Sequence, residues 1–166
     1  MGTPLHCTSV TRRIVLFAII VTGLMIGVAP GWAKDAPTDL RFLDVEEGGT
    51  FVDVDRSGGF EPTIGDQFIS IDGLYAWAGT KRGDRVGRVH VIGTIVSPAT
   101  AVISATAVLR DGTVQVEGVL SFTSRVTTLA VTGGTGRYAG ARGTVTVRNI
   151  GGDESSRSSI VIRLIA

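Results

Sequence analysis

From Leu40 to the end of the chain, short apolar runs alternate with breaks centred on glycine. Apolar and polar residues alternate with a period of two, which is typical of strands with one buried face, and no window of helical length carries an apolar stripe. Turn residues fill the breaks at 57–59, 79–84, 111–112 and 151–153. The pattern predicts strands near these residues: 40–46, 50–55, 66–75, 85–96, 101–110, 113–123, 126–131, 143–150 and 158–165.

Asp111-Gly112 lies between two alternating runs and is the strongest short hairpin signal in the chain. The strand after it has one apolar face and one polar face. The apolar face comprises Val114, Val116, Leu120 and Phe122, and the polar face comprises Gln115, Glu117, Ser121 and Thr123. This strand is therefore expected to have one dry side and one wet side.

About eight or nine short strands with neighbour-to-neighbour turns predict an all-β domain. An eight-stranded antiparallel β-barrel satisfies the pattern best, because closure removes the unpaired edges that an open sheet exposes. A two-sheet sandwich is the alternative. A barrel of this size either fills its interior with side chains or encloses one small apolar ligand.

The first 33 residues have the pattern of a signal peptide. Arg12 and Arg13 precede an apolar run over residues 14–28, and Gly31 and Ala33 form a small-residue cleavage pattern. We therefore expect a signal helix at 1–33, a linker at 34–39, a barrel domain at 40–166, and a secreted or extracytoplasmic protein. An uncleaved membrane anchor and a twin-arginine export signal are alternatives.

Removal of this segment changes the charge and the available chemistry. The remaining 14 basic and 15 acidic residues give a net charge of −1, so we expect no nucleic-acid partner and, after cleavage, no membrane partner. Cys7 and His6 are also removed, leaving His90 as the only histidine. We therefore expect no metal centre and no thiol chemistry.

Residues 131–143, with sequence VTGGTGRYAGARG, imitate a nucleotide-binding glycine loop. Such a loop needs a helix after it, but residues 144–148 are a β-branched run that predicts a strand. The glycines are better explained by a tight, partly left-handed connection between antiparallel strands. We therefore expect no cofactor, and a nicotinamide-dependent reductase remains only as a further alternative.

Several segments together carry a more specific match, in this order: 63–68 (TIGDQF), 74–75 (LY), 79–88 ending in VGR, and 129–143 (LAVTGGTGRYAGARG). Through them the chain resembles the allene oxide cyclase and dirigent proteins over residues 40–165. The resemblance implies an eight-stranded barrel, commonly a trimer, with an apolar cavity and no cofactor. It also implies control over a reactive intermediate, by cyclising it, coupling it or guiding its cycloaddition.

The resemblance also suggests site residues. Asp44 falls at about the position of a glutamate that polarises the substrate in the cyclases, and Arg142 matches an arginine that recurs in dirigent proteins. Tyr75 and Tyr138 are placed where they line a cavity mouth. The cavity cysteine of the cyclases has no counterpart, because residues 91–94 offer only Gly93.

Asp44 and Glu46, with Asp53 and Asp55 further on, lie at alternating positions and so share one face. The simpler interpretation is a solvated outer face, because a buried charge is costly unless it is paired. If that face pointed inward, burial would raise the pKa of a carboxyl group and make it a proton donor or acceptor.

The remaining candidates also have two interpretations each. Arg142 binds a ligand oxygen or caps backbone carbonyls. Asp66 lines a cavity or fixes a turn at the start of a strand. His90 acts as a base or lies with Arg88 on an outer face or subunit contact. Tyr75 and Trp77 form a lid or an ordinary half-buried pair.

Two hypotheses of function follow. In the first, an exported barrel binds a small apolar or phenolic intermediate and directs its cyclisation or coupling, as a cofactor-independent cyclase or isomerase or as a dirigent-like protein. In the second, a secreted binding or structural barrel has a filled interior and no chemistry. A cavity of about 300 Å³ or more favours the first hypothesis, and a plugged lumen favours the second.

Overall fold

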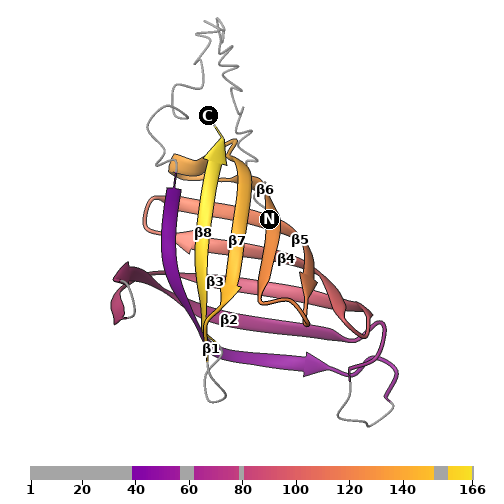
Figure 1. The fold of residues 1–166 in the computed structure, drawn as a ribbon. Helices are drawn as coiled ribbons and strands as arrows, with labels where there is room; N and C mark the ends of the chain where they lie inside the picture. The colour runs from indigo at the N-terminus through magenta and orange to yellow at the C-terminus, as the bar shows by residue number, and fades with distance from the viewer. Residues whose placement is uncertain (1–38, 57–61, 79–80, 152–156, 166) are drawn as a thin grey trace, which may run out of the picture.

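Eight strands form one closed antiparallel barrel in which each strand pairs with its neighbours in the sequence and β8 pairs with β1 (Figure 1). The computed structural model describes residues 39–56, 62–78, 81–151 and 157–165. The predicted fold class is therefore confirmed, while the predicted signal helix lies outside the described residues. The strands are β1 (Asp39–Val52), β2 (Gln67–Ala78), β3 (Lys81–Ser97), β4 (Thr100–Leu109), β5 (Gly112–Ser121), β6 (Val126–Gly134), β7 (Arg142–Asn149) and β8 (Arg157–Ile165).

Strand β1 bends sharply and joins two parts of the barrel. Residues 39–45 pair with β8 and residues 42–52 pair with β2 (Figure 1). The two strands predicted at 40–46 and 50–55 are thus one strand, and the predicted break between them is a bulge between Glu46 and Gly48. A bulge inserts one extra residue and increases the local bend, which closure of a small barrel requires.

The Asp111-Gly112 hairpin is confirmed, since β4 ends at Leu109 and β5 begins at Gly112. The turn predicted at 79–84 was too long, because β3 already begins at Lys81. A β-bulge in the pairing of β2 with β3 accommodates the glycine at position 83, which the sequence pattern suggested was part of a turn.

The glycine-rich segment joins the antiparallel strands β6 and β7, as predicted, through one turn of 3₁₀ helix, η2 (Gly136–Tyr138). Gly136 has φ of 60° and Gly140 has φ of 74°, conformations that favour glycine. The backbone N–H of Arg137 donates to the carbonyl of Asp111 at 2.8 Å, so this loop packs on the β4–β5 turn. The single 3₁₀ turn is followed by strand β7 and not by an α-helix, so the segment does not have the dinucleotide-binding geometry.

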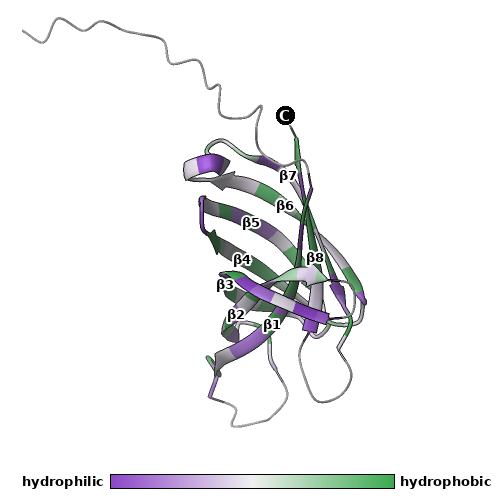
Figure 2. Ribbon diagram, turned by 90° about the vertical axis from the view of Figure 1, so that its left-hand side faces the viewer, coloured by the Kyte–Doolittle hydropathy of each residue, from purple (hydrophilic) through white to green (hydrophobic). Residues whose placement is uncertain are grey.

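Hydrophobic and hydrophilic residues alternate along the strands (Figure 2), and the buried hydrophobic residues form one core cluster. Val114 and Val116 of β5 are buried in the core, as predicted, whereas Phe122 is 48% exposed. The prediction for Phe122 was wrong because β5 ends at Ser121 and its alternation does not continue past that residue. Within the described residues, no helix is long and apolar enough to cross a membrane.

Candidate active site in the barrel

The barrel encloses a cavity of about 300 Å³, lined by side chains from all eight strands. Most of the lining is aliphatic, and two of the three β4 side chains are the small residues Ala105 and Ala107, which leave volume unfilled. The polar lining residues gather on β1, β2 and β8: Asp44, Glu46, Ser70, Asp72 and Ser158. The cavity thus meets the size expected of a barrel that holds a small ligand, and its lumen is not plugged.

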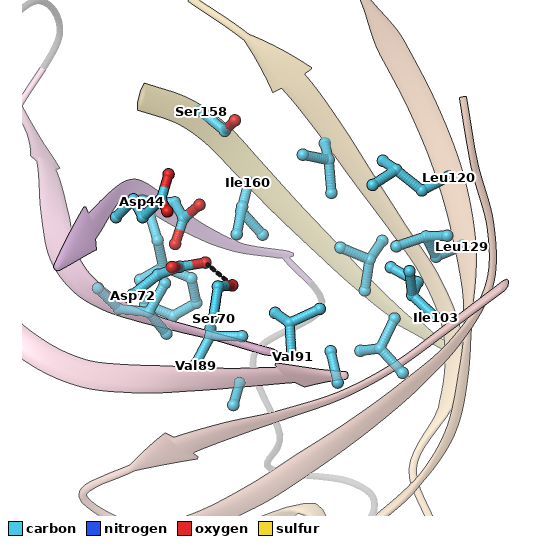
Figure 3. Close-up of a pocket in the computed structure, with 18 of the residues that line it drawn as sticks. Asp44, Ser70, Asp72, Val89, Val91, Ile103, Leu120, Leu129, Ser158 and Ile160 are labelled. Carbon is cyan, nitrogen blue, oxygen red and sulfur yellow. Dashed lines mark hydrogen bonds between the residues drawn. The ribbon is translucent and has the colours of Figure 1, made fainter. Parts of the chain in front are cut away.

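The polar groups lie at one end of this cavity. In Figure 3 the carboxyl groups of Asp44 and Asp72 lie close together, while Ile103, Leu120 and Leu129 form the opposite wall. Glu46 is exposed, so the acidic end borders solvent. A ligand bound here would place an apolar body against the aliphatic wall and a polar group against the acids.

The two aspartates have few polar partners. Asp72 is 9% exposed, and its Oδ2 accepts a long hydrogen bond of 3.4 Å from the hydroxyl of Ser70. The Oδ1 atoms of Asp44 and Asp72 are buried and accept no hydrogen bond from any described residue. Buried carboxyl oxygens without donors are unusual, and such groups are candidates for binding a ligand.

Burial shifts the pKa values of both aspartates upward. Desolvation, with smaller contributions from the charges of Asp72 and Glu46, raises the pKa of Asp44 to about 8. Desolvation also raises the pKa of Asp72 to about 6, although the hydrogen bond from Ser70 opposes the shift. Two neighbouring carboxyl groups with separated pKa values can serve at neutral pH as an acid and a base.

The position of Asp44 and Glu46 corrects the simpler interpretation of the acidic face. Both residues line the cavity, so this part of β1 faces inward and is not a solvated outer face. The bulge after Glu46 shifts the alternation by one residue, so that odd-numbered positions share the inward face beyond it. Gly49 and Phe51 accordingly pair with the cavity-lining residues Ser70 and Phe68. The alternating column of four acids is therefore broken.

The other two acids of that column, Asp53 and Asp55, lie beyond the end of β1 and close to Asp66. Asp66 is only 2% exposed, and its carboxylate accepts hydrogen bonds from the backbone N–H groups of Thr63 at 2.7 Å and Val54 at 2.8 Å. These bonds, the one from Thr63 foremost, lower the pKa of Asp66. Asp66 thus fixes the turn that leads into β2, which is one of its two predicted interpretations, and it does not line the cavity.

Tyr75 lies on the outer side of β2 and does not line the cavity. It is 4% exposed, its hydroxyl donates to Glu47 Oε1 at 2.8 Å, and the guanidinium of Arg82 lies 3.6 Å from its ring centre. Arg85 NH2 donates to the other oxygen of Glu47 at 2.6 Å. The hydrogen bond from Tyr75, the largest influence, lowers the pKa of Glu47. Tyr75 therefore belongs to a polar cluster that covers the outside of β2.

Tyr138 of η2 is buried in the hydrophobic core, and desolvation raises the pKa of its hydroxyl. Arg142 is exposed, and its NH1 donates to the carbonyls of Thr132 at 2.7 Å and Ala141 at 2.8 Å. His90 is exposed beside Arg88 on the outer face of β3. None of Tyr138, Arg142 and His90 belongs to the cavity lining, so the structure separates these candidates from Asp44.

Asp72 is a charged cavity residue that the sequence analysis did not single out. The signal was present, because Phe68, Ser70, Asp72 and Leu74 alternate along a predicted strand and all line the cavity. Two apolar residues at the ends of this run indicated the buried face, and Asp72 lies on that face. An acidic residue on the apolar face of a strand is the signal that identifies Asp72 as a candidate.

The structure is thus a closed eight-stranded antiparallel barrel, and a barrel of this size is wide enough to hold one small ligand. Residues 50–162 match the family described as allene oxide cyclase barrel like domain. The chain therefore belongs to this family, as the resemblance indicated. A search of curated protein sequences finds no match.

Solved structures with the same fold include proteins of several activities. Pyocyanin demethylase is 21% identical with a TM-score of 0.61, over 76% of this chain and 99% of that one. The pterocarpan synthase dirigent protein PsPTS1 is 20% identical with a TM-score of 0.61, over 76% and 92%. A Diels–Alderase from Streptomyces koyangensis is 13% identical with a TM-score of 0.55, over 80% and 72%. At these identities the likeness establishes the fold alone.

Proposed function

We propose that the barrel binds a small, mainly apolar or phenolic intermediate in its cavity and directs its cyclisation or coupling. The observation that carries this proposal is the pair of buried aspartates at one end of an otherwise aliphatic cavity. A site that excludes water and holds a flexible molecule in one conformer lowers the entropic part of the barrier and selects one stereochemical outcome.

The two aspartates have distinct roles in this proposal. Asp44, with a pKa of about 8, is protonated at neutral pH and donates its proton to a carbonyl, epoxide or quinone methide oxygen of the ligand. Asp72, with a pKa of about 6, is mostly ionised and accepts a proton from a C–H or O–H group of the same ligand. For a cyclisation, one proton is given and one is taken, so the product is an isomer and no co-reactant is needed. Proton exchange with solvent at the exposed acidic end then returns Asp44 to its protonated form and Asp72 to its ionised form.

Several structural neighbours have activities of this kind. A pterocarpan synthase dirigent protein, Diels–Alderases and a cyclase that catalyses a [4 + 2] cycloaddition share the barrel. Their activities support the class of reaction proposed here. The kind of ligand proposed for this protein is inferred from the lining of its own cavity. Arg142 has no part in the proposed step because it binds backbone carbonyls.

Native mass spectrometry of protein purified from its producing cells tests the proposal. We expect a small molecule to be retained by the wild type and lost from Asp44→Asn/Asp72→Asn. Incubation of the retained molecule with fresh wild-type protein should yield an isomer of the same mass that differs in chromatographic retention. A molecule that is unchanged by the incubation would support the alternative of a non-catalytic binding barrel. Wild-type protein that carries no small molecule after purification from its producing cells would contradict both the proposed function and a binding barrel.

We also propose that the chain is exported and forms a trimer, as the signal-like segment and the resemblance indicate. The outer surface of β2 to β5 supports an oligomer, because large apolar side chains are exposed there in paired rows: Ile69 beside Ile92, and Val102 beside Val119. Contiguous exposed apolar surface is typical of protein–protein contacts. The intact mass of the protein from its native source tests cleavage after Ala33.

A further inference from the structure

The charged groups of the cavity are all acidic. Asp44 and Glu46 on β1 and Asp72 on β2 line it, and β8 adds the uncharged Ser158. Strands β3 to β7 contribute only apolar side chains to the lining, among them Ile103, Leu120 and Leu129. No lysine, arginine or histidine is part of this lining, so nothing in it compensates a negative charge.

The aspartates are also poorly satisfied by the protein itself. Asp72 is more than nine-tenths buried, and its Oδ1 has no hydrogen-bond donor among the described residues. Asp44 Oδ1 is likewise buried and accepts no hydrogen bond from the described residues. A buried carboxylate is stabilised by a nearby opposite charge, and none of the described lining residues supplies one, which leaves this role to a ligand.

Building on the ligand cavity of the proposed function, we infer that the acidic end is a binding site for the positive centre of an organic cation. The cation's apolar body lies against Ile103, Leu120 and Leu129, and its ammonium or N-alkylated ring nitrogen lies against Asp44 and Asp72 (Figure 3). A carboxylate or sulfonate of the same shape is excluded, because like charges repel strongly where water is scarce.

Binding of a cation is coupled to proton release in this site. At neutral pH the empty cavity holds a proton on Asp44, whose pKa is raised to about 8, while Asp72, with a pKa of about 6, is mostly ionised. A bound positive charge favours their ionised forms and expels a proton. The affinity for a cation therefore increases as the pH rises from 5 to 9, whereas the affinity for a neutral ligand does not.

Three probes of matched shape test the inference: phenyltrimethylammonium, its neutral isostere tert-butylbenzene, and the anion benzenesulfonate. Isothermal titration calorimetry with the whole protein at pH 9 should show phenyltrimethylammonium binding at least about tenfold more tightly than tert-butylbenzene, with no binding of benzenesulfonate. At pH 5 the preference should fall to about threefold or less. At pH 7 the heat of cation binding should depend on the ionisation enthalpy of the buffer, which reports the released proton.

Variants assign the effect to the aspartates. Asp44→Asn/Asp72→Asn should lose the preference for phenyltrimethylammonium and keep its affinity for tert-butylbenzene, which also shows that the cavity is intact. Glu117→Gln removes an exposed carboxylate of β5 outside the lining and should change neither affinity.

The outcomes separate this inference from the proposed function. If tert-butylbenzene binds and phenyltrimethylammonium binds no more tightly, the inference is overturned while the ligand cavity stands. Binding of benzenesulfonate equal to that of the cation overturns it as well. If none of the three probes binds, the ligand cavity fails and the inference fails with it.

Discussion

Asp44 of β1 and Asp72 of β2 lie on neighbouring strands and point into the same cavity, where the charge of Asp72 adds to desolvation in raising the pKa of Asp44 to about 8 (Figure 3). Their backbones are held by pairing of Asp44 with Leu74 and of Glu46 with Asp72. The strand register therefore fixes the separation of the two carboxyl groups, and every prediction about the cavity depends on that register.

Stability should depend on pH through Asp44. Its pKa is about 8 in the folded protein and 3.8 for an aspartate side chain free in water. The folded state therefore binds the proton more tightly than the unfolded state, and stability falls as the pH rises from about 4 to about 8. Asp44→Asn removes this dependence. We expect a gain of about 2 to 5 kcal/mol in the free energy of unfolding at pH 9 and little change at pH 4.

Urea denaturation of the wild type and Asp44→Asn across this pH range measures the effect. Glu117→Gln serves as the control, because its side chain is exposed outside the cavity. Parallel stability curves for wild type and Asp44→Asn would show that the Asp44 carboxyl is not desolvated.

Filling the cavity should block ligand binding without unfolding the protein. Ala107→Leu extends a lining side chain of β4 into the void, while Val108→Leu places the same side chain on the outer face of the same strand. Calorimetry should show at least about a tenfold loss of tert-butylbenzene affinity for Ala107→Leu and no loss for Val108→Leu. Equal affinities would place the ligand elsewhere.

Gly93 makes room for the ring of Phe68, its partner on β2, and a side chain at this position would overlap the ring. Gly93→Ala should therefore push Phe68 aside and destabilise the barrel by about 1 to 3 kcal/mol. Phe68→Leu in the same chain should recover part of the loss. Gly48→Ala is the matched control, because nothing lies within 4 Å of its added carbon.

Chemical denaturation of these variants gives the comparison. A Gly93→Ala variant as stable as Gly48→Ala would mean that Phe68 moves away at no cost. In that event the packing of Phe68 on Gly93 would not contribute to the shape of the cavity wall.

Asp66 should act on stability and not on ligand binding. Asp66→Ala removes the acceptor of the Thr63 and Val54 backbone N–H groups and should lower the midpoint of thermal unfolding by about 5 °C or more. Its pKa is lowered by these bonds, so its stabilising effect is present above about pH 4 and is lost as the pH falls further. Reduced tert-butylbenzene affinity at full stability would instead assign Asp66 to the cavity.

The proposed trimer depends on the exposed apolar rows of β2 to β5. Ile92→Glu places a charge in the centre of these rows and should convert the trimer to monomer in light scattering coupled to size-exclusion chromatography. Thr144→Glu, on the exposed face of β7, should leave the mass unchanged. A monomeric wild type at micromolar concentration would refute the trimer.

The sequence predicted the class of fold because period-two alternation and glycine-centred turns are local signals. It failed at the bulge after Glu46, since an extra residue changes which side chains face inward and leaves no mark in composition. The predicted turn at 79–84 failed for a similar reason, because Gly83 is accommodated within the irregular pairing of β2 and β3.

The site was partly predictable. Asp44 was found through the family resemblance, and it does line the cavity. Asp72 was missed although its alternation with Phe68, Ser70 and Leu74 placed it on the buried face of the strand. For Arg142 the sequence left two interpretations open, and the choice between them depends on the path of the β6–β7 loop. Such relations between distant residues are set by the closed barrel and cannot be derived from local spacing.

A carbon-detected NMR titration of the aspartate carboxyl groups tests the central claim most directly, because it observes the two acids inside the barrel without requiring a known ligand. We expect the Asp44–Asp72 pair to titrate with apparent pKa values of about 8 and about 6, and Asp44→Asn to remove the upper transition. Titration of every aspartate near pH 4 would contradict the account, because it would show that these carboxyl groups are hydrated and that no dry acidic cavity exists.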